Sequence, residues 1–172
     1  FAEIWGPLGN GFGDPPRGPV VCVAGGIGQT PFVALAKWWT RGATYAGVRH
    51  PQVAGRGQVS LLYGARSADL LAGLDDFAAA GVDVEVATDD GSAGHRGFVT
   101  DLLLARLARG ERPTKLIGCG PAPMLAALTK IALREGIECD LSLENHMACG
   151  FGACFSCVTP IVQDDGSTDL KR

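Results

Sequence analysis

The sequence lacks the features of membrane proteins and of nucleic-acid-binding proteins. No apolar run approaches the roughly 20 residues that a spanning helix needs, and the beginning of the chain lacks the charged-then-apolar layout of a signal peptide. Charged residues make up only 19% of the chain, the net charge is −3, and no run of Lys or Arg occurs. The sequence therefore lacks the basic patch that binding to nucleic acid or to an anionic membrane surface would require. We expect a soluble, cytoplasmic protein that binds small molecules and protein partners.

The six cysteines are not spread as in a secreted, disulfide-linked protein. Three of them, Cys149, Cys154 and Cys157, lie within nine glycine-rich residues, which favours metal ligation over disulfides. The chain of 172 residues is long enough for one well-buried domain and a small appendage. It has no initial Met and begins with residues that read as the end of a strand, so we expect a natural N-terminal portion before Phe1.

Apolar strands alternate with helical segments along most of the chain. The run from Val20 to Ala24 is continuously apolar and ends in glycines, which is typical of a strand buried on both faces. The expected strands cover residues 20–24, 59–63, 82–88, 115–119 and 138–143. The expected helices cover residues 31–39, 68–80, 99–109 and 123–135. This alternation predicts an α/β fold with a doubly wound five-stranded parallel sheet. We expect the polar stretch between Gly42 and Gly57 to be a surface loop.

A glycine-rich turn follows the first expected strand, where a doubly wound fold binds its ligand. Glycines allow close approach to a pyrophosphate, and the following helix offers N–H groups and partial positive charge. The turn differs from the G-x-G-x-x-G fingerprint, because Thr-Pro stands in place of the later glycine. A tight turn without a ligand is the alternative. A β-branched residue at Gly28 should weaken NADH binding and leave the domain folded. The expected nucleotide contacts are Gly25, Gly26, Gly28, Gln29, Thr30 and Pro31.

Two further turns are expected at the same crevice. Cys119, Gly120 and Pro121 follow the fourth strand, and two glycine turns at neighbouring strand ends favour an occupied site. Gly64 and Arg66 follow the second strand, where doubly wound proteins contact the adenosine ribose. Arg66 either meets a phosphate there or is an ordinary solvated arginine, so it does not decide between NAD and NADP.

The cysteine loop has the spacing C-x4-C-x2-C, which is given for plant-type [2Fe–2S] ligation. Thiolates suit iron and sulfide, and the intervening glycines permit the positive φ values of a wrapped loop. We expect the sulfurs of Cys149, Cys154 and Cys157 to lie within a few ångströms of one another. Zinc is the alternative, although structural zinc sites usually have two C-x2-C pairs. Cys139 and Cys22 read as buried thiols, and Cys119 is expected to line the nicotinamide crevice.

These motifs together resemble a known family. The segments are Gly6 to Phe12, Gly25 to Pro31, Tyr63 to Arg66, Cys119 to Met124, and Met147 to Cys154. In this order they are similar to the electron-transfer subunit of NAD-dependent dihydroorotate dehydrogenase, a flavoprotein related to ferredoxin-NADP reductases.

The resemblance implies the domains, cofactors and partner. Residues 1–19 would link to a missing FAD-binding barrel, residues 20–144 would bind NAD, and residues 145–172 would form a truncated [2Fe–2S] segment. Electrons from dihydroorotate would pass from the FMN of a catalytic subunit through the cluster to FAD and NAD, within a heterotetramer for pyrimidine biosynthesis. The family's fourth cysteine would lie beyond Arg172. Exposed Met147, Phe151 and Phe155 would suit docking to the catalytic subunit or would pack on their own domain. No catalytic residue is assigned.

Two other functions compete with this interpretation. One is the small subunit of a ferredoxin-NADP transhydrogenase or a sulfhydrogenase-type flavoprotein, a group that often has Asp as the first cluster ligand, unlike Cys149 here. The other is a non-catalytic metal-binding module, which the two intact glycine turns disfavour.

Overall fold

The computed structural model describes residues 11–13, 17–42, 58–163 and 165–171. The chain forms two compact units, Asp14–Leu143 and a second unit made of Phe1–Gly13 with Glu144–Arg172. Much of the expected linker at residues 1–19 and most of the expected surface loop lie outside the described residues. None of the helices in the described ranges has the length and apolar character needed to span a bilayer.

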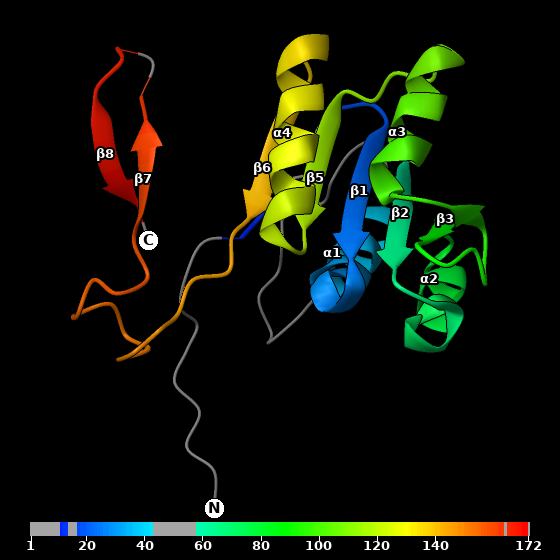
Figure 1. The fold of residues 1–172 in the computed structure, drawn as a ribbon, viewed down its shortest axis with the longest axis horizontal. Helices are drawn as coiled ribbons and strands as arrows, with labels where there is room; N and C mark the ends of the chain where they lie inside the picture. Colours follow the sequence, from blue (N-terminus) through cyan, green and yellow to red (C-terminus); the bar gives the residue numbers. More distant parts are fainter. Residues whose placement is uncertain (1–10, 14–16, 43–57, 164, 172) are drawn as a thin grey trace, which may run out of the picture. The chain divides into compact units, whose positions relative to one another are not determined.

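The larger unit contains a six-stranded sheet in which every neighbouring pair of strands is parallel. The strand order is β4-β3-β2-β1-β5-β6, and Figure 1 shows β2, β1 and β5 at its centre. The strands are β1 (Val20–Gly25), β2 (Val59–Ala65), β3 (Asp83–Thr88), β4 (His95–Arg96), β5 (Lys115–Cys119) and β6 (Glu138–Ser142). The order reverses between β1 and β5, and such a switch point is where open α/β sheets bind ligands.

Helices cover both faces of this sheet (Figure 1). They are α1 (Thr30–Arg41), α2 (Leu74–Ala80), α3 (Val99–Ala108) and α4 (Ala122–Glu135), with short 3₁₀ helices η1 (Gly26–Gln29) and η2 (Ala68–Leu70). Leu103 of α3 and Leu128 of α4 are fully buried in one cluster with Val21 and Val23 of β1. Because side chains alternate along a strand, Cys22 and Ala24 face the opposite layer, where Phe32 of α1 and Phe77 of α2 are also fully buried.

The predicted strands and three of the four predicted helices are present, with ends shifted by at most two residues. The expected helix over residues 68–80 is wrong in its first half. Gly73 adopts φ 74 and precedes α2, so only η2 and a shorter helix form. The sixth strand, β4, was not expected, because its two residues, His95 and Arg96, carry no apolar pattern.

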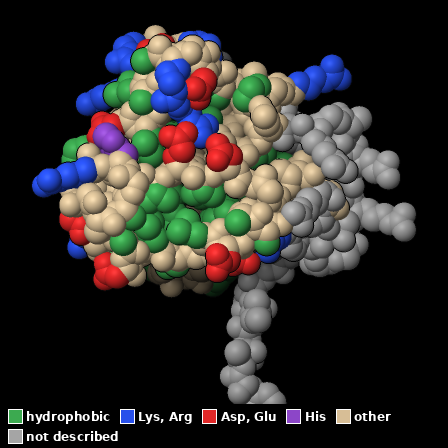
Figure 2. All heavy atoms as spheres, turned by 90° about the vertical axis from the view of Figure 1, so that its right-hand side faces the viewer, with side chains coloured by type: hydrophobic (Ala, Val, Ile, Leu, Met, Phe, Trp, Pro, Cys, Tyr) green, Lys and Arg blue, Asp and Glu red, His purple; other side chains and the backbone are tan. Residues whose placement is uncertain are grey.

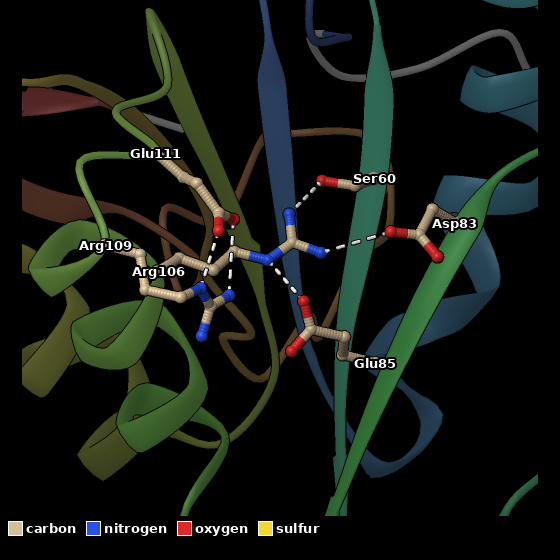
Figure 3. A network of polar contacts seen from close by, with 6 residues as sticks. All are labelled: Ser60, Asp83, Glu85, Arg106, Arg109 and Glu111. Atoms are coloured by element: carbon tan, nitrogen blue, oxygen red, sulfur yellow. Dashed lines mark hydrogen bonds and ion pairs between the residues drawn. The ribbon is translucent and has the colours of Figure 1, made fainter.

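A buried arginine fastens α3 to the sheet (Figure 3). The guanidinium of Arg106 donates from Nε to Glu85 Oε1 at 2.6 Å and from a terminal nitrogen to Ser60 Oγ at 2.7 Å. A weaker ion pair joins it to Asp83 at 3.5 Å. Ser60 lies in β2 and Glu85 in β3, so one side chain links three elements.

Apolar side chains gather on the face beside α2 and β3, with acidic side chains around them (Figure 2). Leu70 of η2 and Leu74 of α2 are exposed, and Val84 and Val86 of β3 are half-buried. Among the described residues, strand β4 pairs with Ala87 and Thr88.

The smaller unit contains the cysteine loop and an antiparallel hairpin of β7 (Thr159–Val162) and β8 (Thr168–Lys171).

Candidate functional site

The carboxyl ends of four parallel strands are level with one another. Ala24 of β1 is in register with Cys119 of β5 and with Tyr63 of β2, and Ala65 of β2 is in register with Thr88 of β3. The two glycine turns therefore follow neighbouring strands at the same edge of the sheet, as the sequence predicts.

The two glycine turns are packed backbone against backbone. A Cβ on Gly28 would lie 2.1 Å from the carbonyl oxygen of Cys119, and a Cβ on Gly120 would lie 2.9 Å from the nitrogen of Gly25. A Cβ on Gly25 would lie 2.6 Å from Pro121 Cδ. The glycines are thus required for packing. This geometry argues against the expectation that a β-branched residue at Gly28 leaves the domain intact, since fixed backbone occupies the space.

Helices α1 and α4 both begin at this edge. In the described part of the chain, neither helix has a side-chain N-cap or an acidic residue in its first turn. A helix N-terminus carries partial positive charge and exposes N–H groups. Two such ends after neighbouring strands suit the two phosphates of a dinucleotide.

The remaining residues of the first turn differ in exposure. Gly26 is half-buried with φ 55, and a Cβ there would meet nothing within 4 Å. Thr30 is exposed, and its hydroxyl donates to the carbonyl of Ile27 at 3.0 Å. Pro31 lies in the first turn of α1. Gln29 is only 7% exposed, and its Oε1 is a buried acceptor with no hydrogen-bond partner among the described residues. Such an atom suits a donor from water or a ligand.

The turn after β2 is held by a loop that the sequence analysis did not single out. The backbone N–H groups of Asp89 and Asp90 donate to the carbonyls of Ala65 and Arg66. Ser92 Oγ accepts from the N–H of Ala68 at 2.7 Å. The run Asp89-Asp90-Gly91-Ser92 at the end of a predicted strand was an available turn signal.

Of the two residues expected at the ribose position, only Arg66 has an exposed side chain. Gly64 has a packing role, because a Cβ there would lie 2.9 Å from Val99 Cβ at the start of α3. Asp90, whose N–H bonds the carbonyl of Arg66, has a carboxylate that accepts from the N–H and hydroxyl of Ser92, and these bonds lower the pKa of Asp90.

The cysteine loop wraps through three residues with positive φ. They are Gly150 (φ 73), Gly152 (φ 85) and Phe155 (φ 61). This conformation turns backbone N–H groups toward sulfur: the N–H of Ala153 donates to Cys149 Sγ at 3.3 Å. Hydrogen bonds from the backbone of Cys154 and Phe151 lower the pKa of Cys149 to about 6.

The second and third cysteines are tied to polar side chains. Cys154 Sγ lies 3.2 Å from Ser156 Oγ, and this contact is the main cause that lowers the pKa of Cys154. The side-chain amide of Asn145 donates to the carbonyl of Cys157 at 3.2 Å and to Thr159 Oγ1 at 2.5 Å. The sequence analysis missed both Ser156 and Asn145.

The expected gathering of all three sulfurs is not observed. Within the described ranges, no three Cys, His, Asp or Glu side chains come together as a metal site. The thiols of Cys149 and Cys154 are held by hydrogen bonds, and coordination itself supplies the energy that brings thiolate ligands together. The soft donors, the positive-φ turns and the lowered thiol pKa values of Cys149 and Cys154 nevertheless fit an iron–sulfur cluster.

The other three cysteines belong to the larger unit. Cys22 is buried in β1, and burial raises its pKa to about 12. Cys139 is half-buried in β6 against the core, and burial raises its pKa to about 11. Cys119 is 6% exposed at the end of β5. The first two thiols are thus poor candidates for ligands at neutral pH.

Two family models match the chain. Residues 22–130 match the oxidoreductase NAD-binding domain. Residues 144–172 match the iron–sulfur cluster binding domain of dihydroorotate dehydrogenase B. The first match contains the candidate nucleotide site, and the second contains the cysteine loop.

Curated relatives carry both segments in the same order. The chain is 34% identical over 164 residues to the dihydroorotate dehydrogenase B (NAD(+)) electron transfer subunit of Caldanaerobacter subterraneus, which covers 95% of this chain and 58% of the relative. It is 40% identical over 157 residues to a probable subunit of the same name from Pyrococcus abyssi, with 91% and 55% covered. The chain thus spans a little over half the length of these relatives.

Solved structures extend the comparison. An NADH-dependent reduced ferredoxin-NADP oxidoreductase, studied for flavin-based electron bifurcation, superposes with a TM-score of 0.75 at 29% identity and covers 98% of this chain and 54% of that chain. A cytochrome P450 reductase of Amycolatopsis gives a TM-score of 0.58 at 30% identity, with 79% and 41% covered. With its strand order, its paired glycine turns and the match over residues 22–130, the chain belongs to the oxidoreductase NAD-binding domain family.

Proposed function

We propose that this chain is the NAD-binding and iron–sulfur portion of an electron transfer subunit of NAD-dependent dihydroorotate dehydrogenase. The observation that carries the proposal is the succession of the two family matches, with the C-x4-C-x2-C loop inside the second. The curated relatives with 34% and 40% identity favour the same function. In this proposal residues 20–144 bind NAD and residues 145–172 hold a [2Fe–2S] cluster.

NAD would bind across the carboxyl edge of β2, β1 and β5. The uncapped starts of α1 and α4 would hold the pyrophosphate through backbone N–H groups and helix dipoles. Gly26, where a Cβ would meet nothing within 4 Å, would let the nucleotide approach the backbone, and Gly25 and Gly120 would keep the two turns packed together. Cys119 would border the nicotinamide. The exposed guanidinium of Arg66 would contact the adenosine end. The protein would orient the cofactor while the hydride chemistry belongs to nicotinamide and flavin.

The cluster would be held by Cys149, Cys154 and Cys157, the three thiols of the loop. When bound, a [2Fe–2S] cluster exchanges single electrons, and FAD converts them to the electron pair of a hydride. The role of this chain would be to hold the thiolates, to direct the N–H of Ala153 at Cys149 Sγ and to bind NAD. A cytoplasmic location belongs to the proposal, since reducing compartments keep such thiols available.

The partner would be the FMN-containing catalytic subunit, in a heterotetramer. Met147, Phe151 and Phe155 are 71%, 61% and 57% exposed beside the cysteines. Apolar side chains exposed around an electron-transfer loop suit a protein interface. Phe151→Asp should therefore reduce co-purification with the catalytic subunit, whereas an unchanged yield would assign Phe151 to its own domain.

The function is tested with the complete natural protein co-expressed with the catalytic subunit. We expect NADH to form from NAD(+) when dihydroorotate is added. Cys154→Ser should abolish NADH formation but leave reduction of an artificial acceptor by the catalytic subunit intact. Absence of NADH formation in a complex that contains all its cofactors would contradict the proposal.

A second candidate function rests on the solved structure with the TM-score of 0.75. That protein is an NADH-dependent reduced ferredoxin-NADP oxidoreductase. Reduction of NADP(+) by reduced ferredoxin, without any activity on dihydroorotate, would favour this alternative.

A further inference from the structure

Ser156, the residue before Cys157, contacts three other residues of the cysteine loop. Its Oγ accepts a hydrogen bond from the N–H of Ala148 at 3.1 Å. The same oxygen lies 3.2 Å from the carbonyl oxygen of His146 and 3.2 Å from Cys154 Sγ. One hydroxyl thus joins the entry of the loop to a proposed cluster ligand. Ser156 lies at an unspecified position of the C-x4-C-x2-C spacing, so the assignment of the function does not depend on it.

The number of protons at Ser156 limits these contacts. A serine hydroxyl has one proton to donate and two lone pairs to accept. The N–H of Ala148 uses one lone pair, so the single proton points either at the carbonyl of His146 or at Cys154 Sγ. When Cys154 is a thiol, its S–H can donate to Ser156 Oγ, and the hydroxyl proton is then available to the carbonyl of His146.

Ligation changes this arrangement, because a cysteine bound to iron is a thiolate with no S–H. Sulfur and oxygen would then face each other as two acceptors unless Ser156 supplies the proton. We propose that the Ser156 hydroxyl donates its hydrogen bond to Sγ of cluster ligand Cys154 and thereby raises the reduction potential of the cluster. This inference rests on the proposed function, since it requires a cluster at Cys154.

The direction of the effect follows from charge. Reduction adds one electron to the cluster, so negative charge on the sulfur ligands grows. A hydrogen bond to an anionic acceptor is stronger than one to a less charged acceptor, and hydrogen bonds to the sulfurs are among the factors that set cluster potentials. Ser156 therefore stabilises the reduced form more than the oxidised form. It is a positioning residue, since it acts through Cys154.

The test is a redox titration of the complete natural protein, followed by the EPR signal of the reduced cluster. Ser156→Ala should lower the ratio of reduced to oxidised cluster at a fixed potential on the order of tenfold, which corresponds to about 59 mV for one electron. Ser156→Thr keeps the hydroxyl and should restore the wild-type potential. Ser167→Ala removes a hydroxyl from the β7–β8 turn of the same unit and should change nothing.

Three other outcomes of this experiment would contradict the proposal. An unchanged or raised potential in Ser156→Ala, with normal iron content, would overturn the role of the hydroxyl and leave the proposed function standing. Loss of the cluster in Ser156→Ala with full loading in Ser156→Thr would assign the hydroxyl to assembly of the loop instead. Absence of a [2Fe–2S] signal in the wild-type protein would overturn both this inference and the proposed function.

Discussion

Gly28 packs against the backbone of Cys119 so closely that there is no room for another carbon between the two turns. A Cβ on Gly28 would also lie 2.9 Å from the nitrogen of Gly120, so the crowding involves two residues of the second turn. Glycine is needed here for close approach, because Gly28 is not among the residues with positive φ. The candidate nucleotide site thus depends on a contact within the protein.

Gly28→Ala should destabilise the NAD-binding unit by at least about 3 kcal/mol, because overpacking against backbone forces the turns apart. NADH affinity should fall as well, since both turns shift. Urea unfolding and an NADH titration measure the two effects. Gly26→Ala is the matched control for stability: space is open there, and only its positive φ costs about 1 kcal/mol. Equal losses of unfolding free energy in the two variants would refute the packing argument.

Cys22 should make the free energy of unfolding depend on pH. Burial raises its pKa from 9.0 to about 12, so the folded state binds the thiol proton more tightly than the unfolded state. The resulting stabilisation is fully present below pH 9 and is lost as pH rises toward 12. The difference in unfolding free energy between wild type and Cys22→Ala should therefore shrink from pH 8 to pH 11. A constant difference would show that Cys22 titrates normally in the folded protein.

At the scale of elements, the five predicted strands follow the sequence closely because their apolar residues are either continuous, as in β1, or alternate with polar ones, as in β3. Strand β5 has the predicted ends, Lys115 and Cys119. The segment at residues 68–80 has helix-forming composition, but Gly73 at φ 74 interrupts it. Tyr63 in β2 also holds this segment in a non-helical conformation, since its hydroxyl accepts from the N–H of Ala72 at 3.3 Å. Such long-range contacts leave no local pattern.

Arg106 is a second feature that the sequence does not reveal, because its partners are 21 and 46 residues away. Arg106→Ala should destabilise the larger unit by about 2 kcal/mol, since it leaves Glu85 and Ser60 without a donor. Glu85 is one-third exposed, so the loss stays below that of a fully buried pair. Arg109→Ala removes an exposed pair with Glu111 (Figure 3) and should leave the unfolding midpoint nearly unchanged. Denaturant unfolding distinguishes the two variants, and equal unfolding midpoints would contradict the role of Arg106 in joining α3 to the sheet.

On the scale of the whole molecule, the chain combines two units whose sequences carry different kinds of information. The larger unit is defined by alternating apolar strands and helices, and its order of elements could be predicted. The candidate nucleotide residues could be found because glycine turns follow neighbouring strands. In the smaller unit the cysteine spacing indicates the ligands, whereas the roles of Ser156 and Asn145 depend on how the loop folds back on itself.

The iron content of the complete natural protein tests which cysteines are ligands of the cluster. Cys149→Ser, Cys154→Ser and Cys157→Ser should each lose most of the iron and acid-labile sulfide of the anaerobically purified protein, because iron–sulfur clusters are held by thiolates.

Cys139→Ser is the matched control and should retain about two irons per chain, the number in a [2Fe–2S] cluster. Its thiol packs against the core beside Leu116, its partner in register, and burial raises its pKa to about 11. A thiol in this environment stays protonated at neutral pH and is a poor ligand. Loss of iron in Cys139→Ser, with the protein still folded by circular dichroism, would instead make Cys139 the fourth ligand and would require β6 to contribute to the cluster site.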